Sequence, residues 1–340
     1  MSAQPVYESP YIPDEQRRLI AAANAFSGCQ PQSIEAITIG LVNQTYRVGT
    51  ELGQMIIQRI SPALHDCGTT NSVAIMEHMV AEGWEVPSQL RSPDGQHTLD
   101  DDQGHRWRAM SYVPSDPVPP MLGNAALTRA GRLLGGWHLS LAKSSYQPQP
   151  TIAHYRDTDH HAEHLGEVLA VLPSSVAYRL GRRALAAYDQ LAAPAASLTQ
   201  LIHGDPKLTN MLFRGGHPFT LIDYDTHMLG QTWMDLGDLA RSVGCFDLAN
   251  GDLPTINRLK TVIDGYRQAT APTADPQTFT AEALRATKHI SLELTMRYLS
   301  DIVDHSYFKA TDQPTLSRAD YLLGRAHNQW RISELVSAKD

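Results

Sequence analysis

The chain has 340 residues, of which 42% are hydrophobic and 19% charged, and its formal net charge is −8 at pH 7. This length favours two domains over one core, and the acidic balance argues against the basic face that a nucleic-acid backbone requires. No apolar run reaches the roughly 18 residues of a membrane-spanning helix. We therefore expect no nucleic-acid partner, no membrane partner and, with three scattered cysteines, a reducing cytoplasmic location.

The first third of the chain has the patterns of a small sheet. Residues 33–40, 43–50 and 53–60 alternate like strands and are separated by glycine-containing turns. Residues 71–83 have a helical pattern that stops at Gly83, and residues 94–114 predict two further strands around an acidic loop. We expect residues 1–114 to form one lobe, with a flexible tail at their polar, proline-rich start.

The remainder of the chain is predominantly helical in pattern. Residues 116–120 (Asp-Pro-Val-Pro-Pro) are typical of a linker, and residues 126–142, 182–193 and 290–303 predict helices. The predicted fold class is therefore α+β, with a small antiparallel β-sheet lobe over residues 1–114 and a larger, mainly helical lobe over residues 115–340.

One stretch of the helical part, residues 201–225 (LIHGDPKLTNMLFRGGHPFTLIDYD), carries a cluster of polar residues at the ends of two short apolar runs. A hairpin would bring Asn210 beside Asp223, with Asp205 one loop away. An amide oxygen and a carboxylate are typical Mg²⁺ ligands, and a third carboxylate beside the metal can accept a proton from a hydroxyl. Lys207 could contact a phosphoryl oxygen as a point charge. These are the parts that phosphoryl transfer requires.

The run His203-Gly204-Asp205-x-Lys207-x-x-Asn210, followed by Ile222-Asp223, resembles the motifs of the protein-kinase-like small-molecule kinases, which include the aminoglycoside phosphotransferases and choline kinases. The resemblance implies a protein-kinase-like two-lobed fold that uses ATP and Mg²⁺. It assigns Asp205 as catalytic base and Asn210 and Asp223 as metal ligands. It also implies that residues 1–114 bind the nucleotide and that residues 115–340 hold the catalytic loop and the substrate site.

Three longer stretches resemble the N-acetylhexosamine 1-kinases more closely: residues 151–161, 222–242 and 296–310. That resemblance implies a sugar substrate phosphorylated at its anomeric hydroxyl, with Arg297 and Tyr307 bonding sugar hydroxyls. Asp157 and Thr158 either cap a helix or form a wall of the sugar pocket. An aminoglycoside or amino-alcohol phosphotransferase is the alternative, and a non-catalytic kinase-like binding protein is a further one.

The predicted nucleotide side departs from the kinase pattern. Residues 40–45 contain a single glycine, so Asn43 and Thr45 either assist a phosphate loop or belong to an ordinary turn. Where kinases place a lysine, the strand offers Gln58 and Arg59, of which only one can face a cleft.

Two further nucleotide contacts are candidates. Met110 and Tyr112 lie in the stretch placed to contact a purine. Glu77 is either the ion-pair partner of an inward Arg59 or a surface charge.

Four other polar positions receive supporting roles. We expect Asp235 to bond the backbone of the catalytic loop and His203 to pack beneath it. Asp225, two residues after Asp223 on the same predicted strand face, is either a second metal ligand or a neighbour of the site. The polar stripe of residues 293–304 either forms surface ion pairs or faces a cavity or a buried network. The sequence leaves the oligomeric state open.

Overall fold

The computed structural model describes residues 14–37, 42–65, 67–171, 175–192, 199–308 and 316–337. These belong to two compact units, Met1–Pro114 and Ser115–Asp340, called here the N-terminal and C-terminal units. Each is described by itself.

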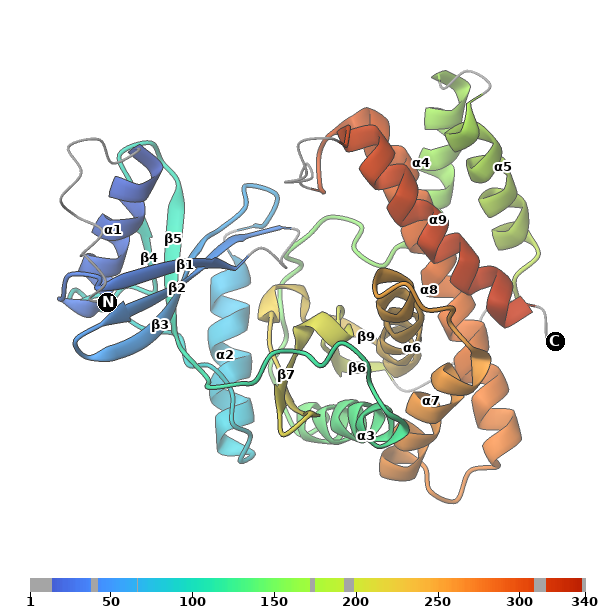
Figure 1. The fold of residues 1–340 in the computed structure, drawn as a ribbon, viewed down its shortest axis with the longest axis horizontal. Helices are drawn as coiled ribbons and strands as arrows, with labels where there is room; N and C mark the ends of the chain where they lie inside the picture. Colours follow the sequence, from blue (N-terminus) through green and yellow to red (C-terminus); the bar gives the residue numbers. More distant parts are fainter. Residues whose placement is uncertain are drawn as a thin grey trace. The chain divides into compact units, whose positions relative to one another are not determined.

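The N-terminal unit is built on a five-stranded antiparallel sheet in the order β1-β2-β3-β5-β4 (Figure 1). The strands are β1 Ser33–Ile37, β2 Gln44–Thr50, β3 Gly53–Arg59, β4 Thr98–Asp100 and β5 Arg106–Ser111. All five predicted strands are confirmed, and the predicted helix is α2, Cys67–Ala81. Alternation along these strands gives the sheet one apolar and one polar face.

The apolar face packs against α1, Asp14–Ser27. Val48, Met55 and Ile57 of the sheet form one buried cluster with Leu19 and Phe26 of this helix. Because successive strand residues point to opposite faces, the burial of Met55 and Ile57 against α1 directs Gln58 to the other face.

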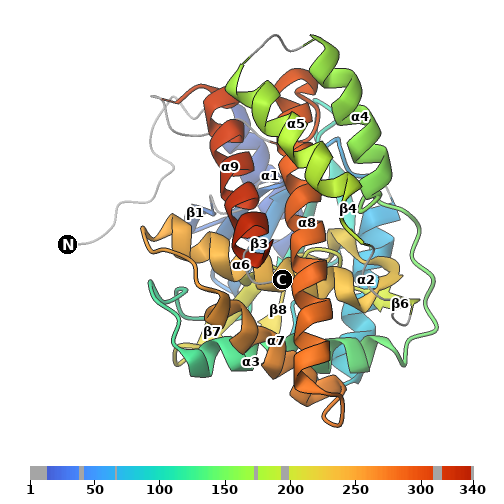
Figure 2. The same cartoon turned by 90° about the vertical axis from the view of Figure 1, so that its right-hand side faces the viewer.

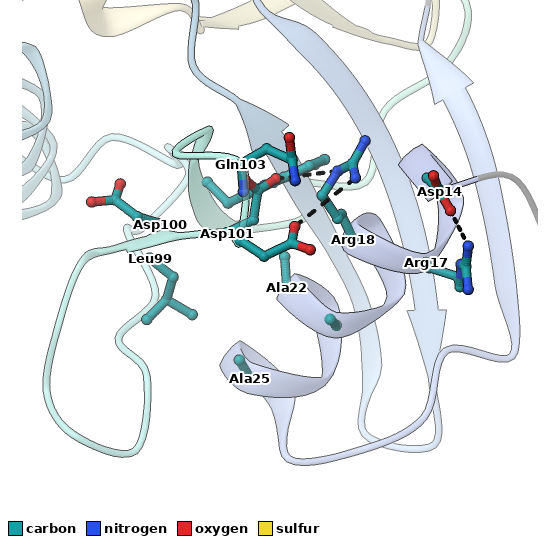
Figure 3. Close-up of a pocket in the computed structure, with 12 residues that line it drawn as sticks. Asp14, Arg17, Arg18, Ala22, Ala25, Leu99, Asp100, Asp101 and Gln103 are labelled. Atoms are coloured by element: carbon teal, nitrogen blue, oxygen red, sulfur yellow. Dashed lines mark hydrogen bonds and ion pairs between the residues drawn. The ribbon is translucent and has the colours of Figure 1, made fainter.

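A cavity of about 670 Å³ lies between α1 and the β4–β5 turn (Figure 3). Asp101 anchors the turn here by accepting a hydrogen bond from Trp107 Nε1 at 3.0 Å, and Arg18 Nε lies 3.5 Å from its Oδ2. Burial alone would raise the pKa of Asp101, but the hydrogen bonds from Trp107 and from the backbone of His105 and Gln103 lower it to about 2. The ionised carboxylate of Asp101 therefore holds the β4–β5 turn together on the α1 side of the sheet.

The C-terminal unit consists of helices around two small two-stranded sheets. The helices are α3 Asn124–Leu141, α4 Thr158–Val171, α5 Val176–Asp189, α6 Thr232–Ala249, α7 Ile256–Thr270, α8 Pro276–Asp304 and α9 Arg318–Ser337. Figure 2 shows α9 beside the long helix α8. No helix in the described part of the chain has both the length and the hydropathy that crossing a membrane requires.

The small sheets pair β6 Thr199–Ile202 with β9 Met228–Gln231, and β7 Met211–Arg214 with β8 His217–Leu221. The predicted helices lie in α3, α5 and α8, although α5 already ends at Asp189. The start of the predicted linker is tied to the β7–β8 hairpin, because Asp116 bridges to Phe213 and its Oδ2 accepts the Gly215 N–H at 2.6 Å.

Candidate active site

The candidate catalytic loop connects β6 to β7 and ends in a short 3₁₀ turn, Leu208–Asn210. Strands β7 and β8 pair directly after it, with Met211 opposite Leu221, and the Ile222 N–H donates to the Asn210 carbonyl at 2.9 Å. This register sets Asn210 next to Asp223, so the hairpin predicted from the sequence creates the site.

Side-chain distances show that the predicted set lies together. Asn210 Nδ2 is 2.9 Å from the Asp205 carbonyl oxygen, 3.2 Å from Asp205 Oδ2 and 3.5 Å from Asp223 Oδ2. Lys207 Nζ donates to Asp205 Oδ2. Burial would lower the pKa of Lys207, but the carboxylates of Asp205 and Asp223 raise it above its usual value. Lys207 is therefore a cation held among these acids.

The conformation around Asp223 corrects one prediction. Asp223 and Asp225 were expected on one face of a strand, but β8 ends at Leu221 and Asp223 has φ +71°. A 3₁₀ turn, Tyr224–Thr226, follows and buries Asp225. Aspartate tolerates left-handed backbone better than most residues, which lets the chain turn directly at the predicted ligand position. Asp225 consequently does not share a strand face with Asp223.

The donor chemistry fits a hard divalent cation. Every side-chain hydrogen bond given for Asn210 within the described residues uses Nδ2, one of them toward Asp223 Oδ2, so Oδ1 is the amide atom that could hold a metal. Mg²⁺ is typically held by one or two such protein oxygens, with phosphate and water in the other positions. No cluster of three His, Cys, Asp or Glu side chains in the described ranges is arranged to hold a metal by itself. These donors would therefore suit a divalent cation that is coordinated by the protein and by a phosphate together.

The support of the loop by Asp235 is confirmed. This fully buried residue accepts the N–H groups of His203 at 2.8 Å and Gly204 at 2.9 Å, and it also lies 2.9 Å from His138 Nε2. Gly204 has φ +84°, and a Cβ there would overlap the Thr226 carbonyl oxygen. His203 is buried beneath the loop as expected, with Nε2 3.1 Å from the Ile222 carbonyl oxygen.

Two residues that the sequence reasoning missed hold the other side of Gly204. Arg156 donates to the Gly204 carbonyl from Nε at 3.0 Å and Nη2 at 2.7 Å, and Tyr155 OH donates to it at 3.2 Å. Arg156 also pairs with Asp238 at 3.2 Å and Glu293 at 3.1 Å. The sequence provided only an indirect indication of Arg156. Asp238 and Glu293 lie in apolar helices, and buried carboxylates require a cation nearby.

Most of the polar stripe of α8 lies in a buried network, which holds Glu293, Arg297 and Asp301. Asp304, by contrast, is exposed and pairs with His164 at 2.7 Å. Glu293 lies 3.5 Å from Arg297 Nη1, and the Arg297 guanidinium lies 5.0 Å from the ring centres of Tyr155 and Tyr307. Asp301 Oδ1 accepts the Tyr307 N–H at 3.0 Å. Burial raises the pKa of Tyr307, and the negative charge of Asp205 adds to the increase. Arg297 and Tyr307 are therefore positioned beside the catalytic loop.

Asp157 and Thr158 occupy different environments. Asp157 caps α4, because its Oδ1 accepts the His160 N–H at 3.2 Å, and it also lines a cavity of about 440 Å³. Thr158 is 4% exposed and donates to Glu293 Oε2 at 2.8 Å. The structure therefore places Thr158 in the buried network and leaves Asp157 at an open surface.

On the N-terminal sheet, Gln58 and Arg59 point to opposite faces. Gln58 Nε2 donates to Thr45 Oγ1 at 3.0 Å, and Gln58 Oε1 accepts from Arg108 Nε at 2.8 Å. Arg59 lies on the α1 face and pairs with Glu15 at 3.4 Å. Of the two alternatives for Glu77, the structure favours the surface charge, because Arg59 pairs with Glu15 and Glu77 is exposed.

The other nucleotide candidates are distributed along the same sheet. Asn43 Oδ1 accepts the Ser61 N–H at 2.9 Å, so it fixes the backbone beyond β3. Met110 is buried, and Tyr112 OH accepts from Arg47 Nη1 at 3.3 Å. Gly40 and Leu41 of the predicted phosphate loop lie outside the described residues.

Comparison with known proteins gives one family and a set of similar folds. Residues 33–274 match the family described as "Phosphotransferase enzyme family". The comparison with curated proteins gave no match.

Three solved structures illustrate the likeness. The microcompartment-associated aminopropanol kinase has a TM-score of 0.64 at 17% identity, covering 95% of this chain and 97% of that one. Amicoumacin kinase, solved with AMP-PNP, Ca²⁺ and its antibiotic, has 0.63 at 16%, covering 94% and 93%. A choline/ethanolamine kinase family protein from Mesorhizobium loti has 0.58 at 17%, covering 96% and 99%. The predicted protein-kinase-like α+β fold is confirmed.

Proposed function

The chain belongs to the phosphotransferase enzyme family and is an ATP-dependent phosphotransferase that acts on a hydroxyl group of a small molecule, and from this premise we propose that its acceptor is a sugar. The specific proposal is transfer to the anomeric hydroxyl of an N-acetylhexosamine or a related hexose. One observation carries the assignment of the reacting centre: Asp205 and Asp223 both lie within hydrogen-bonding distance of Asn210 Nδ2.

In this proposal Asp205 orients the acceptor hydroxyl and accepts its proton while the oxygen attacks the γ-phosphorus, and the bond from this phosphorus to the β,γ-bridging oxygen breaks, so that ADP leaves. Asn210 Oδ1 and Asp223 would hold Mg²⁺, which would offset the charge of the phosphates. Lys207, already beside Asp205, donates to the transferred phosphoryl group. The network of Asp235 and Arg156 around Gly204 keeps the base in place, so that its orientation is set before the substrates bind.

The charges near the base favour an uncharged acceptor. Three carboxylates of the neighbouring helices are paired with arginine: Asp238 with Arg241, Glu293 with Arg156, and Asp301 with Arg318. Arg297, a further cation, faces Tyr155 and Tyr307. A polycation would gain little from acids that are already neutralised, whereas a sugar could accept from Arg297 and bond Tyr307. The N-acetylhexosamine itself rests on the sequence resemblance.

An amine-bearing acceptor is the second candidate, and one observation favours it. The cavity of about 440 Å³ beside the loop is lined by both Asp157 and Asp225, which would suit an ammonium group. The aminopropanol and amicoumacin kinases share the fold, although this likeness does not carry their substrates to this chain.

The roles of the two units complete the proposal. Residues 1–114 would bind ATP through the polar sheet face that carries Thr45 and Gln58, and residues 115–340 would supply the metal, base and acceptor contacts. Gln58 is preferred to Arg59 because Arg59 is engaged with α1.

A panel of sugars, aminoglycosides and amino alcohols, read by ADP release, tests the acceptor. We expect turnover with an N-acetylhexosamine, and phosphorus NMR of the product should show coupling to the anomeric proton. The matched control is the Asp205→Asn variant, which should release ADP ~10²- to 10⁴-fold more slowly than wild type. Turnover confined to the amines, or a phosphate on another carbon, would refute the proposed acceptor chemistry.

A further inference from the structure

We propose that the hydroxyl of Tyr155 is a further binding group for the acceptor, beside the predicted contacts Arg297 and Tyr307. On binding, this hydroxyl turns from the Gly204 carbonyl oxygen to an oxygen of the acceptor. The inference rests on the proposed function, because it takes Asp205 as the base and places the acceptor next to it. It deepens that function by assigning a second role to a residue that also supports the catalytic loop.

The first observation is that three donor groups share one acceptor atom. Arg156 donates to the Gly204 carbonyl oxygen from Nε at 3.0 Å and Nη2 at 2.7 Å, and the Tyr155 hydroxyl donates to the same oxygen at 3.2 Å. A carbonyl oxygen has two lone pairs, and the two guanidinium N–H groups, which are charged and lie closer, already match them. The Tyr155 hydroxyl is therefore the weakest of the three donors, and it can turn away while this oxygen stays paired.

The second observation is the position of Tyr155 beside both the base and a predicted acceptor contact. The Gly204 carbonyl belongs to the peptide that leads into Asp205, so the Tyr155 hydroxyl lies next to the backbone of the base. The centre of its ring lies 5.0 Å from the Arg297 guanidinium. Burial and the negative charge of Asp205 raise the pKa of Tyr155 well above its usual value, against the positive charge of Arg156. The hydroxyl therefore keeps its proton at neutral pH and can donate it to an acceptor oxygen.

The third observation is that the side chain is accessible and that its backbone is held in an unusual conformation. Tyr155 is only partly buried and lines the cavity of about 440 Å³, whereas Arg156 is buried. The residues on either side of it, His154 and Arg156, both have left-handed backbone, with φ +53° and +64°. Non-glycine residues adopt this conformation at a cost in free energy, and such residues cluster at active sites. Two strained neighbours therefore hold Tyr155 next to a space that a ligand can enter.

Steady-state kinetics of Tyr155→Phe test the contact, with N-acetylglucosamine as acceptor and ADP release as the readout. We expect the KM for the acceptor to rise ~3- to 10-fold, the range for one lost neutral hydrogen bond, while kcat and the Kd for MgATP stay within about twofold of wild type. The melting temperature should also stay close to wild type, because Arg156 keeps the Gly204 carbonyl oxygen paired. The matched control is Tyr178→Phe, which removes a hydroxyl near the start of α5 and should leave all four quantities unchanged.

Two results would overturn the inference. One is an acceptor KM for Tyr155→Phe equal to that of wild type, with or without a fall in kcat, which would show that the hydroxyl acts only on the loop. The other is an equal weakening of acceptor and MgATP, which would indicate a general structural role. Failure of the proposed function would look different, since wild-type protein would then not phosphorylate N-acetylglucosamine. The same comparison is then made with the acceptor that the screen of sugars and amines identifies, and the same two results decide it.

Discussion

At the scale of single residues, two buried charged side chains, Asp235 and Arg156, hold the backbone of the candidate catalytic loop. Asp235 accepts the backbone N–H groups of His203 and Gly204, which precede the base. Arg156 donates to the carbonyl oxygen of Gly204. Because these contacts fix the peptides on both sides of Gly204, the backbone that leads into Asp205 is held by the scaffold. In the proposed function Asp205 accepts the proton of the acceptor hydroxyl, so its substitution is the most direct test of the chemistry.

Replacing Asp205 with asparagine should remove the base while preserving the shape of the loop. We expect kcat to fall by ~10²- to 10⁴-fold, the usual contribution of a general base, with MgATP affinity and melting temperature close to wild type. Steady-state ADP release, calorimetry and thermal melting measure the three quantities. The comparison variant is Asp189→Asn, which changes an exposed carboxylate at the end of α5 and should keep the wild-type rate. A rate for Asp205→Asn near the wild-type value would show that another group accepts the proton.

At the scale of elements, close helix packing explains part of the C-terminal unit. Helices α3 and α7 approach so closely that a Cβ at Gly131 would overlap the Val262 carbonyl oxygen, and one at Gly265 would overlap the Thr128 carbonyl oxygen. The contact is reciprocal, with a glycine on each helix facing the backbone of the other. Since α3 also carries His138, which bonds Asp235, this packing connects to the support of the catalytic loop.

The Gly131→Ala substitution should therefore destabilise the protein. Backbone atoms cannot rotate away as a side chain can, so we expect a cost of about 1–3 kcal/mol in the free energy of unfolding. Gly166→Ala in α4 is the matched control, because a Cβ there meets no atom within 4 Å and alanine favours the helix by ~0.5–1 kcal/mol. Chemical denaturation at neutral pH measures both. Equal stability of Gly131→Ala and Gly166→Ala would contradict the packing.

At the scale of the whole molecule, several imidazoles are buried in uncharged form. Burial lowers the pKa of His161 to about 4, and it also lowers the pKa values of His203, His227 and His289. The hydrogen bond to Asp304 acts in the opposite direction on His164, whose pKa it raises. In the unfolded chain the pKa of each of these histidines is about 6.5.

The sign of the pH dependence follows from proton binding. Between about pH 6.5 and pH 4 the unfolded chain takes up protons at these lowered groups and the folded chain does not, so stability falls as the pH falls. His164 contributes stability below about pH 6.5 and loses it as the pH rises. Its effect is opposite to that of the four histidines with lowered pKa values, which together outweigh it. We expect a lower melting temperature at pH 5 than at pH 7.5. His161→Gln should reduce this difference, and the exposed His217→Gln should not; a melting temperature that rises on acidification would refute the account.

Much of the fold and the centre of the site could be predicted, for reasons visible in particular residues. Asp205, Lys207, Asn210 and Asp223 belong to one loop and one hairpin, so their meeting follows from local pairing. The strands of the N-terminal unit were equally clear, because their alternation and their glycine turns are local properties. The conformation at Asp223 escaped prediction, since the end of β8 depends on the turn that follows it.

By itself, therefore, the sequence determined the order of the elements, the family motif and the chemistry that its residue types permit. Tertiary structure alone decided that Gln58 and Arg59 face opposite ways, that Arg108 reaches Gln58 from another strand, and that Arg156 holds Gly204. The physical reason is distance along the chain: the register of strands and the crossing of helices bring such residues together. The spacing of neighbouring residues in the sequence does not predict a contact between residues that are far apart along the chain.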